Sequence, residues 1–416
     1  MSSFKTNLPM GYELSNFFYS LWVIPKISNT MNDSDLQTRN ARSEALSLTL
    51  KKIACITKGL NFADRSGKSP VILREGCWRE AYLPSHNSGK DIEFRNAYSY
   101  WQTLPKIDGN FDNWIRKEKG SNWLAQRTRV IDGQTKALNV LYFENRSDFE
   151  VTVLKGSLIQ NNKPLISTDK PFSFVMSPQN NFYAGAPDPG VFHHSSMLAG
   201  AVVLTAGEIK TDPLGRVISF NNCSGHYKPP VATLIRLIQF FKRHKVDLSQ
   251  VQEVCARIVY IDHKERYYYR SVKEFLEDID ELNGTSTIEI LTTLKLMKDF
   301  DIDITKLCIG SKTFAEFIQN LEEIHACSDP IAVKEQMEFL KEIEFDFSKI
   351  KKIVTYKNVS AVPILRFLKA DTSNFDNDKI EIQVIYDMRL QPFMCKLRPE
   401  NKKPVFQIGN PAGVVA

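Results

Sequence analysis

The chain has 416 residues, with a hydrophobic fraction of 43% and a charged fraction of 25%, which are the proportions of a soluble globular protein. These values exclude an intrinsically disordered chain and a fibrous repeat, and the length favours two or three domains. The net charge of +6 comes without a dominating basic run, so nucleic acid is not expected as a partner.

The seven cysteines are scattered along the chain and are never spaced as CxxC. This spacing predicts neither a disulfide framework nor a zinc site, and it fits a reducing cytosol. The longest mainly apolar run, MLAGAVVLTAG, has eleven residues, whereas a spanning helix needs about 20. The apolar FFYSLWVIP near the start lacks a basic leader. We therefore predict a soluble protein without a membrane span or a signal peptide.

The first 230 residues divide into two predicted segments. Residues 1–95 mix helical signals with polar loops, and the apolar spacing after Ser34 predicts one helix. Residues 96–230 contain short aromatic and β-branched runs broken by turn residues, which predicts a β-rich domain. Its predicted strands are 149–154 and 157–160, joined by a Lys155-Gly156 turn, then 172–176, and a hairpin within 201–220 that turns at TDPLG.

The hydrophobic period changes to 3.6 residues after Pro229-Pro230. Residues 231–352 are predicted to be a helical domain of amphipathic segments with partner binding as its role. Residues 353–416 are predicted to be irregular apart from one strand-like run, IEIQVIYDM. No repeat period emerges. The expected fold class is α+β, with a central mainly antiparallel β domain, an N-terminal helical segment and a C-terminal helical domain.

Two stretches, HHSSMLAGAVVLTAGEI at 193–209 and SGHYKPP at 224–230, hold three of the seven histidines beside serines and one glutamate. These residue types serve acid–base and nucleophilic chemistry. A structural role fits the same residues, with histidines and serines bonding the backbone and Glu208 in water. Gly207, next to Glu208, would let a ligand or a second backbone approach closely.

Strand alternation in the first of these stretches predicts which side chains share a face. One predicted face holds Val202, Leu204, Ala206, Glu208 and Lys210. The other holds Val203, Thr205, Gly207 and Ile209. A glutamate that follows apolar neighbours on its own face lies either at a wet sheet edge or beside a polar partner.

The order of several motifs resembles that of the plant IQM proteins, which are linked to calmodulin and carry an IQ motif. These motifs are YSYW at 98–101, FDNWI at 111–115, FEVTVLKGSLI, FSFVMSPQNNFYAG, GVFHHSSMLAGAVVLTAGEI and SGHYKPP. The resemblance covers roughly residues 95–230. An IQ motif would read IQxxxRGxxxR, and the nearest string, Ile238-Gln239 in LIQFFKRHK, lacks the spaced Arg-Gly.

The same boxes resemble the LnaB-like Legionella effectors, which are actin-activated enzymes that use ATP to transfer AMP and carry a serine and an HxxxE signature. This resemblance implies a catalytic set made of Ser195, Ser196, Glu208 and His226. It implies a substrate-binding set made of His194, Tyr227, Lys228 and Lys210. The position four after His226 is Pro230, so Glu208 is expected to replace the missing acid.

From this second resemblance we predict a bacterial effector enzyme, acting in the host-cell cytoplasm, that transfers AMP from ATP to a phosphorylated acceptor or hydrolyses ATP. Host actin is the expected activator, Mg²⁺ is the expected companion of ATP, and no metal site is expected from the protein's own residues. The alternative is a non-catalytic IQM-like interaction protein whose helical half binds a regulatory partner. ADP-ribosyl transfer from NAD is a third hypothesis, although no diagnostic arginine box precedes the serines.

The basic amphipathic segment LIRLIQFFKRHK, at 234–245, has two interpretations of its own. It resembles helices that bind calmodulin or another partner. It also fits a helix of the core with a solvated basic face.

Overall fold

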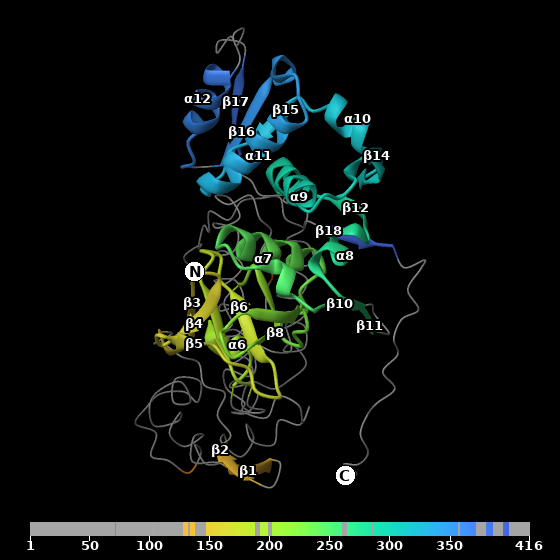
Figure 1. Cartoon of the computed structure of the whole chain (residues 1–416). Coiled ribbons are helices and arrows are strands. Elements are labelled where there is room, and N and C mark those ends of the chain that lie inside the picture. Colours follow the sequence, from red (N-terminus) through yellow and green to blue (C-terminus); the bar gives the residue numbers. More distant parts are fainter. Residues whose placement is uncertain are drawn as a thin grey trace, which may run out of the picture.

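The computed structural model describes Val71, Thr103 and residues 128–131, 134–137, 147–187, 192–198, 202–259, 264–284, 286–356, 358–371, 380–385 and 394–398. The helix predicted after Ser34 and the motifs at 98–101 and 111–115 lie outside these residues. The fold is α+β, as predicted: a large, mainly antiparallel sheet is followed by alternating helices and short strands (Figure 1). None of the described helices is long and apolar enough to cross a membrane.

A nine-stranded sheet forms the centre of the described structure, in the order β11-β10-β9-β8-β6-β7-β3-β4-β5. Its strands are β3 (Glu150–Leu154), β4 (Ser157–Gln160), β5 (Lys163–Pro164), β6 (Phe172–Met176), β7 (Phe182–Gly185), β8 (Thr205–Thr211), β9 (Val217–Asn221), β10 (Glu253–Val259) and β11 (Lys264–Tyr269). Neighbours are antiparallel except β9 and β10, which are parallel. A separate hairpin pairs β1 (Thr128–Ile131) with β2 (Gln134–Ala137).

Both predicted hairpin turns are confirmed. Lys155 and Gly156 have φ angles of 52° and 81°, the positive values that a tight turn between β3 and β4 requires. Between β8 and β9, the Asp212 carboxylate accepts hydrogen bonds from the backbone N–H groups of Leu214 and Arg216. Local side-chain chemistry therefore sets these turns.

Helices cover the two faces of the sheet differently. On one face, α7 (Ala232–Arg243) packs with the sheet in the large core, which includes Phe174 and Phe220 from the strands and Phe241 from the helix. On the other face, the short α6 (His194–Met197) lies over a smaller apolar cluster that includes Val175, Tyr183, Ala206, Met197 and Tyr227. Residues 232–241 of α7 are all buried, so the interpretation of this segment as a core helix is confirmed.

The region from α7 onward contains a threefold structural repeat. The sequence did not predict this repeat, because no repeat period emerges from it. The first copy comprises α7, η4 (Leu248–Gln250), β10, β11, α8 (Val272–Glu277) and β12 (Ile279–Asn283). The second comprises α9 (Thr287–Asp299), η5 (Ile304–Lys306), β13 (Cys308–Ile309), β14 (Lys312–Thr313), α10 (Phe314–Gln319) and β15 (Glu323–His325). The third comprises α11 (Pro330–Glu342), η6 (Phe347–Lys349), β16 (Lys352–Tyr356), α12 (Val362–Asp371) and β17 (Glu381–Ile385).

The long helix of each copy is followed by the same turn. The long helix ends before a residue with positive φ, which is Lys245, Asp301 or Glu344. An aspartate then accepts a hydrogen bond from the backbone N–H two residues on: Asp247 from Ser249, Asp303 from Thr305, and Asp346 from Ser348. The strand that follows runs parallel to the strand before the helix, in β9–β10, β12–β13 and β15–β16.

The strings VDLSQV, IDITKL and FDFSKI carry this turn in the sequence, with an aspartate between apolar residues and a hydroxyl two residues later. The stretch of chain from the first turn to the second is longer than the stretch from the second to the third, so the three turns do not recur at a fixed interval. A search for a fixed period therefore misses them.

The helical domain predicted for 231–352 contains more strands than expected. Two amphipathic runs of this predicted domain, SVKEFLEDIDEL and KTFAEFIQNLEEI, are helical only in α8 and α10, because their last residues belong to β12 and β15. The segment after 353, predicted to be irregular, holds α12, whose first N–H is bonded by the Ser360 hydroxyl. Within the strand-like run IEIQVIYDM, Glu381–Ile385 form β17. The short β18 (Met394–Leu397) pairs with β12.

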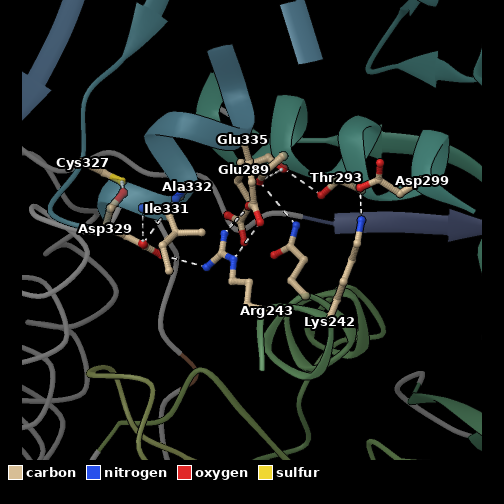
Figure 2. A network of polar contacts seen from close by, with 12 residues as sticks. Lys242, Arg243, Glu289, Thr293, Asp299, Cys327, Asp329, Ile331, Ala332 and Glu335 are labelled. Carbon is tan, nitrogen blue, oxygen red and sulfur yellow. Dashed lines mark hydrogen bonds and ion pairs between the residues drawn. The ribbon is translucent and has the colours of Figure 1, made fainter. Parts of the chain in front are cut away.

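Ion pairs join the first helices of the three repeats (Figure 2). On α7, Arg243 bonds Asp329 at 2.8 Å and Glu335 at 3.0 Å, both on α11 or its cap. Lys242 pairs with Asp299 at the end of α9. Further inside, the Arg236 guanidinium bonds the Glu289 carboxylate at 2.6 Å, and both side chains are almost completely buried. The three copies are thus fastened to one another and, through α7, to the large sheet.

The expected domain boundary at residue 230 does not separate two cores. Strands β10 and β11 extend the large sheet beyond it, and one continuous core runs from Val151 to Leu397.

A chain that ends at residue 235 lacks both strands and most of α7, so we expect it to aggregate rather than form a folded β domain. A chain ending at residue 328 keeps two repeats and is expected to remain monodisperse. Size-exclusion chromatography and thermal unfolding of both chains measure this difference.

Candidate functional site

Three histidines come together on the side of the sheet that α6 covers. The ring centroids of His193 and His226 are 4.9 Å apart, and those of His194 and His226 are 6.2 Å apart. His194 and His226 are only 7% and 5% exposed, and Ser195, Ser196 and Ser224 are fully buried. The structure therefore brings the HSS box (residues 194–196) and the SGHY box (residues 224–227) together, and it places most of their polar side chains away from solvent.

Ser196 supports the local structure of α6. The backbone N–H of His193 donates to Ser196 Oγ at 3.0 Å, and the backbone N–H of Ser196 donates to the His193 carbonyl at 2.9 Å. This reciprocal pair closes the first turn of a four-residue helix that has too few internal bonds to stand alone. The hydroxyl of Ser196 is thus engaged as a hydrogen-bond acceptor at a helix start.

His194 fastens α6 to β8. Its Nε2–H donates to the carbonyl oxygen of Gly207 at 2.8 Å. The proton is assigned to Nε2 because a carbonyl oxygen can only accept a hydrogen bond. Burial lowers the pKa of His194 to about 4, against the opposing effect of the Gly207 hydrogen bond, and the neighbouring His226 lowers it further. His194 is therefore a neutral buried donor at neutral pH.

This burial predicts a loss of stability in mild acid. The folded-state pKa of about 4 lies below the ordinary value of 6.5, so the unfolded chain binds more protons as the pH falls from 6.5 to 4. We expect a decrease of about 3 kcal/mol in the free energy of unfolding across this range from His194 alone. Urea unfolding at several pH values measures it. His194→Gln keeps a donor for Gly207 but does not titrate, and it should flatten the curve; an unchanged slope would contradict the assignment.

Glu208 has a partner that the sequence did not suggest. Its carboxylate accepts a hydrogen bond from the Asn221 side-chain N–H at 3.0 Å, and its backbone N–H donates to the side-chain oxygen Oδ1 of Asn221 at 2.9 Å. The same oxygen accepts from the backbone N–H of Cys223 at 2.8 Å. Asn221 thus clamps β8 to the turn that begins the SGHY box.

Asn222 holds the same turn against β10. Its side-chain amide donates to the carbonyl oxygens of Pro229 and Arg257, both at 2.9 Å, and its side-chain oxygen accepts from the Arg257 backbone N–H at 2.7 Å. The pair Asn221-Asn222 at the end of a strand was the available sequence signal, since asparagine often bonds nearby backbone in turns. Between them the two side chains fix both ends of the segment that carries His226.

Gly207 lies where a second backbone approaches, which is one of the two roles predicted for it. A Cβ atom at this position would sit 1.9 Å from the carbonyl oxygen of Asn221. The predicted alternation holds inside β8, where Ala206 faces the α6 cluster and Ile209 the large core. It fails before Thr205, because Val203 faces the α6 cluster and Leu204 the large core.

The remaining predicted site residues have different surroundings. Tyr227 is buried in the apolar cluster beneath α6, and its backbone N–H donates to the Ser224 hydroxyl. Lys228 is half-buried with a φ angle of 44°, in the turn itself. Lys210 lies half-buried on β8 opposite Ser219. Among the described residues, no three histidine, cysteine or acidic side chains are grouped to hold a metal ion.

The chain is similar to plant IQ proteins. The family model described as the IQ motif-containing protein middle domain matches residues 145–234, which span β3 to the start of α7. The IQ domain-containing protein IQM3 of Arabidopsis thaliana is 27% identical over 224 residues, which is 52% of this chain and 46% of that protein. IQM1 of the same plant is 29% identical over 51% of this chain and 43% of that protein. The chain thus matches less than half the length of these relatives, and no solved structure matches it.

These comparisons correct the enzyme prediction. The matched family and the named relatives are IQ proteins rather than AMP-transferring enzymes, so the prediction of a nucleotidyltransferase is wrong. The description as a bacterial effector is contradicted on the same ground, and no comparison supports actin or a phosphorylated acceptor as partners. The resemblance to IQM proteins is supported, and that to LnaB-like effectors is not.

Proposed function

We propose that this protein is a non-catalytic interaction protein. Residues 145–234, which match the IQ-protein middle domain, form a rigid base, and the three repeats bind a regulatory partner. The observation that carries the proposal is the match at 145–234 to an IQ-protein middle domain. The burial of the HSS and SGHY boxes supports it, because Ser196, His194 and Asn222 are used in contacts that hold the fold.

The partner does not dock on α7. Ile238 and Gln239, the nearest approach to an IQ motif, are 0% and 4% exposed, and the Gln239 amide bonds Thr292 on α9. Binding through this helix would require the protein to open its core.

The second repeat offers a more accessible surface. A cavity of about 630 Å³ lies beyond the carboxyl ends of the parallel strands β12 and β13, and its lining includes Ile290, Ile309 and Phe317. Crevices at this end of parallel strands are common binding sites. Helix α10, which contributes Phe317, has no fully buried residue. We therefore assign the partner surface to this cavity.

Calmodulin is the partner to test first, since the relatives are named for their IQ domains. Isothermal titration with and without calcium is expected to show binding that Phe317→Asp weakens at least about tenfold. Leu214→Asp is the matched control, because Leu214 is exposed in the turn between β8 and β9 and does not line the cavity. This variant should bind like the unaltered protein. Equal binding by both variants would refute the assignment of the cavity.

Labelled ATP separates this proposal from catalysis. Incubation with ATP and Mg²⁺, with and without actin, is expected to yield neither AMP adducts nor free AMP. Formation of either product would overturn the non-catalytic proposal. Binding of ATP without turnover stays a prediction, and filter binding in the same experiment measures it.

A further inference from the structure

A second polar cluster lies on the sheet beyond the site described above. Alternation along β10 and β11 directs Val254, Ala256, Tyr267 and Tyr269 into the large core. The residues between them share the opposite face. In the strand register, Cys255 lies opposite Tyr268, and Arg257 lies opposite Arg266.

Within the described residues, neither arginine of this cluster forms an ion pair with a carboxylate. Like charges directly opposite each other destabilise a sheet. Arg257 is only 9% exposed, and its Nε has no hydrogen-bond acceptor within the part of the chain that the structure describes. Arg266 contacts the Tyr268 hydroxyl. A buried guanidinium of this kind favours a nearby negative charge.

Two thiols lie beside these arginines. Asn221 is level with Cys255 on the neighbouring parallel strand, and Cys223 follows two residues later with its N–H bonded to the Asn221 side chain. The Cys223 and Cys255 side chains interact with each other. Cys223 is half-buried, so reagents can reach it, whereas Cys255 is 4% exposed.

The surroundings favour the thiolate of Cys223. The interaction with Cys255 lowers the pKa of Cys223, and the Arg266 and Arg257 charges lower it further, against burial and the Glu208 carboxylate. The same interaction and burial raise the pKa of Cys255. The cluster therefore has one activated thiol and one protonated thiol in contact, the arrangement of a redox-sensitive pair.

We propose that Cys223 is a site of reversible oxidation by peroxide and that Cys255 is its resolving thiol. The Cys223 thiolate attacks one oxygen of hydrogen peroxide; the O–O bond breaks, and hydroxide leaves and is protonated to water. The Cys255 sulfur then attacks the sulfenic sulfur; the S–O bond breaks, and the Cys255 proton leaves with that oxygen as water. Two thiols are oxidised to one disulfide while one peroxide is reduced to two waters. The disulfide links the start of the SGHY turn to β10.

Mass spectrometry of the full, folded chain tests this. Brief treatment with hydrogen peroxide is expected to produce a reducible link between the peptides that contain Cys223 and Cys255. In Cys255→Ser, Cys223 should accumulate as a sulfenic acid that dimedone traps. Cys308, which is exposed on β13, is the control thiol in the same chain, and its modification should be at least about fivefold slower than that of Cys223.

The pH dependence of alkylation provides an independent readout. The midpoint for iodoacetamide labelling of Cys223 should lie below the ordinary cysteine pKa of about 8.5. Arg266→Gln should move it upward, whereas Arg270→Gln, an equal charge change just after the same strand, should not. A midpoint that both variants leave unchanged, or a Cys223 that peroxide modifies no faster than Cys308, would overturn the proposal. Neither result depends on partner binding.

Discussion

Glu289→Leu is expected to lower the free energy of unfolding by about 3–5 kcal/mol, because it leaves the Arg236 guanidinium charged and buried without its carboxylate. Arg236 bonds Glu289 at 2.6 Å, and their side chains are 2% and 3% exposed. Arg236 also donates to the carbonyl oxygen of Leu204, so the stranded charge lies between the sheet and the second repeat. Urea unfolding monitored by circular dichroism measures the change.

Two control variants separate the buried charge from lost packing. Arg236→Met combined with Glu289→Leu removes both charges and should restore most of the stability. Lys351→Ala removes one partner of an exposed ion pair with Glu322, 2.5 Å long, and should cost less than about 1 kcal/mol. A double variant as unstable as Glu289→Leu would show that packing, not charge, accounts for the loss.

Gly207→Ala is expected to prevent folding or to lower the free energy of unfolding by more than about 3 kcal/mol, at the upper end of overpacking effects. The added Cβ would lie 1.9 Å from a backbone carbonyl, which cannot rotate away as a side chain can. The substitution would force β8 and β9 apart at the point where Asn221 bonds Glu208. Yield of soluble protein and thermal unfolding measure the effect.

Gly225→Ala is the matched control, since Gly225 is in the SGHY box and its added Cβ would have no atom within 4 Å. Its free energy of unfolding should stay within about 0.5 kcal/mol of the unaltered protein. If both alanine variants unfold alike, the close approach at Gly207 is not what requires glycine there.

The catalytic prediction for the candidate site rested on the resemblance to LnaB-like effectors, because its residue types fit a structural role as well. Histidines, serines and a glutamate near one another in the sequence suggested a reaction centre, and the structure does bring His193, His194 and His226 together. The hydrogen-bond partners point to a structural role: His194 bonds a backbone carbonyl, and Glu208 bonds Asn221. His194 bonds Gly207 because the chain folds back within the same stretch, and Glu208 bonds Asn221 on the next strand, so neither partner could be deduced from residue spacing alone.

The sequence by itself determined the local elements of this protein. The Lys155-Gly156 and TDPLG turns, the long amphipathic helices and the strand at 381–385 all form where the pattern predicts them. These features depend on residues within a few positions of one another, through backbone conformation, side-chain bonds to adjacent N–H groups and the period of apolar residues.

Only the tertiary structure decided which of these elements share a core. Strand β10 joins β9 across the helix between them, so the large sheet crosses the expected boundary at residue 230. The three Asp-capped turns become a repeat only when each following strand pairs in parallel with the strand before its helix. Burial and strand pairing depend on contacts between residues distant in the chain, and such contacts leave no fixed spacing in the sequence.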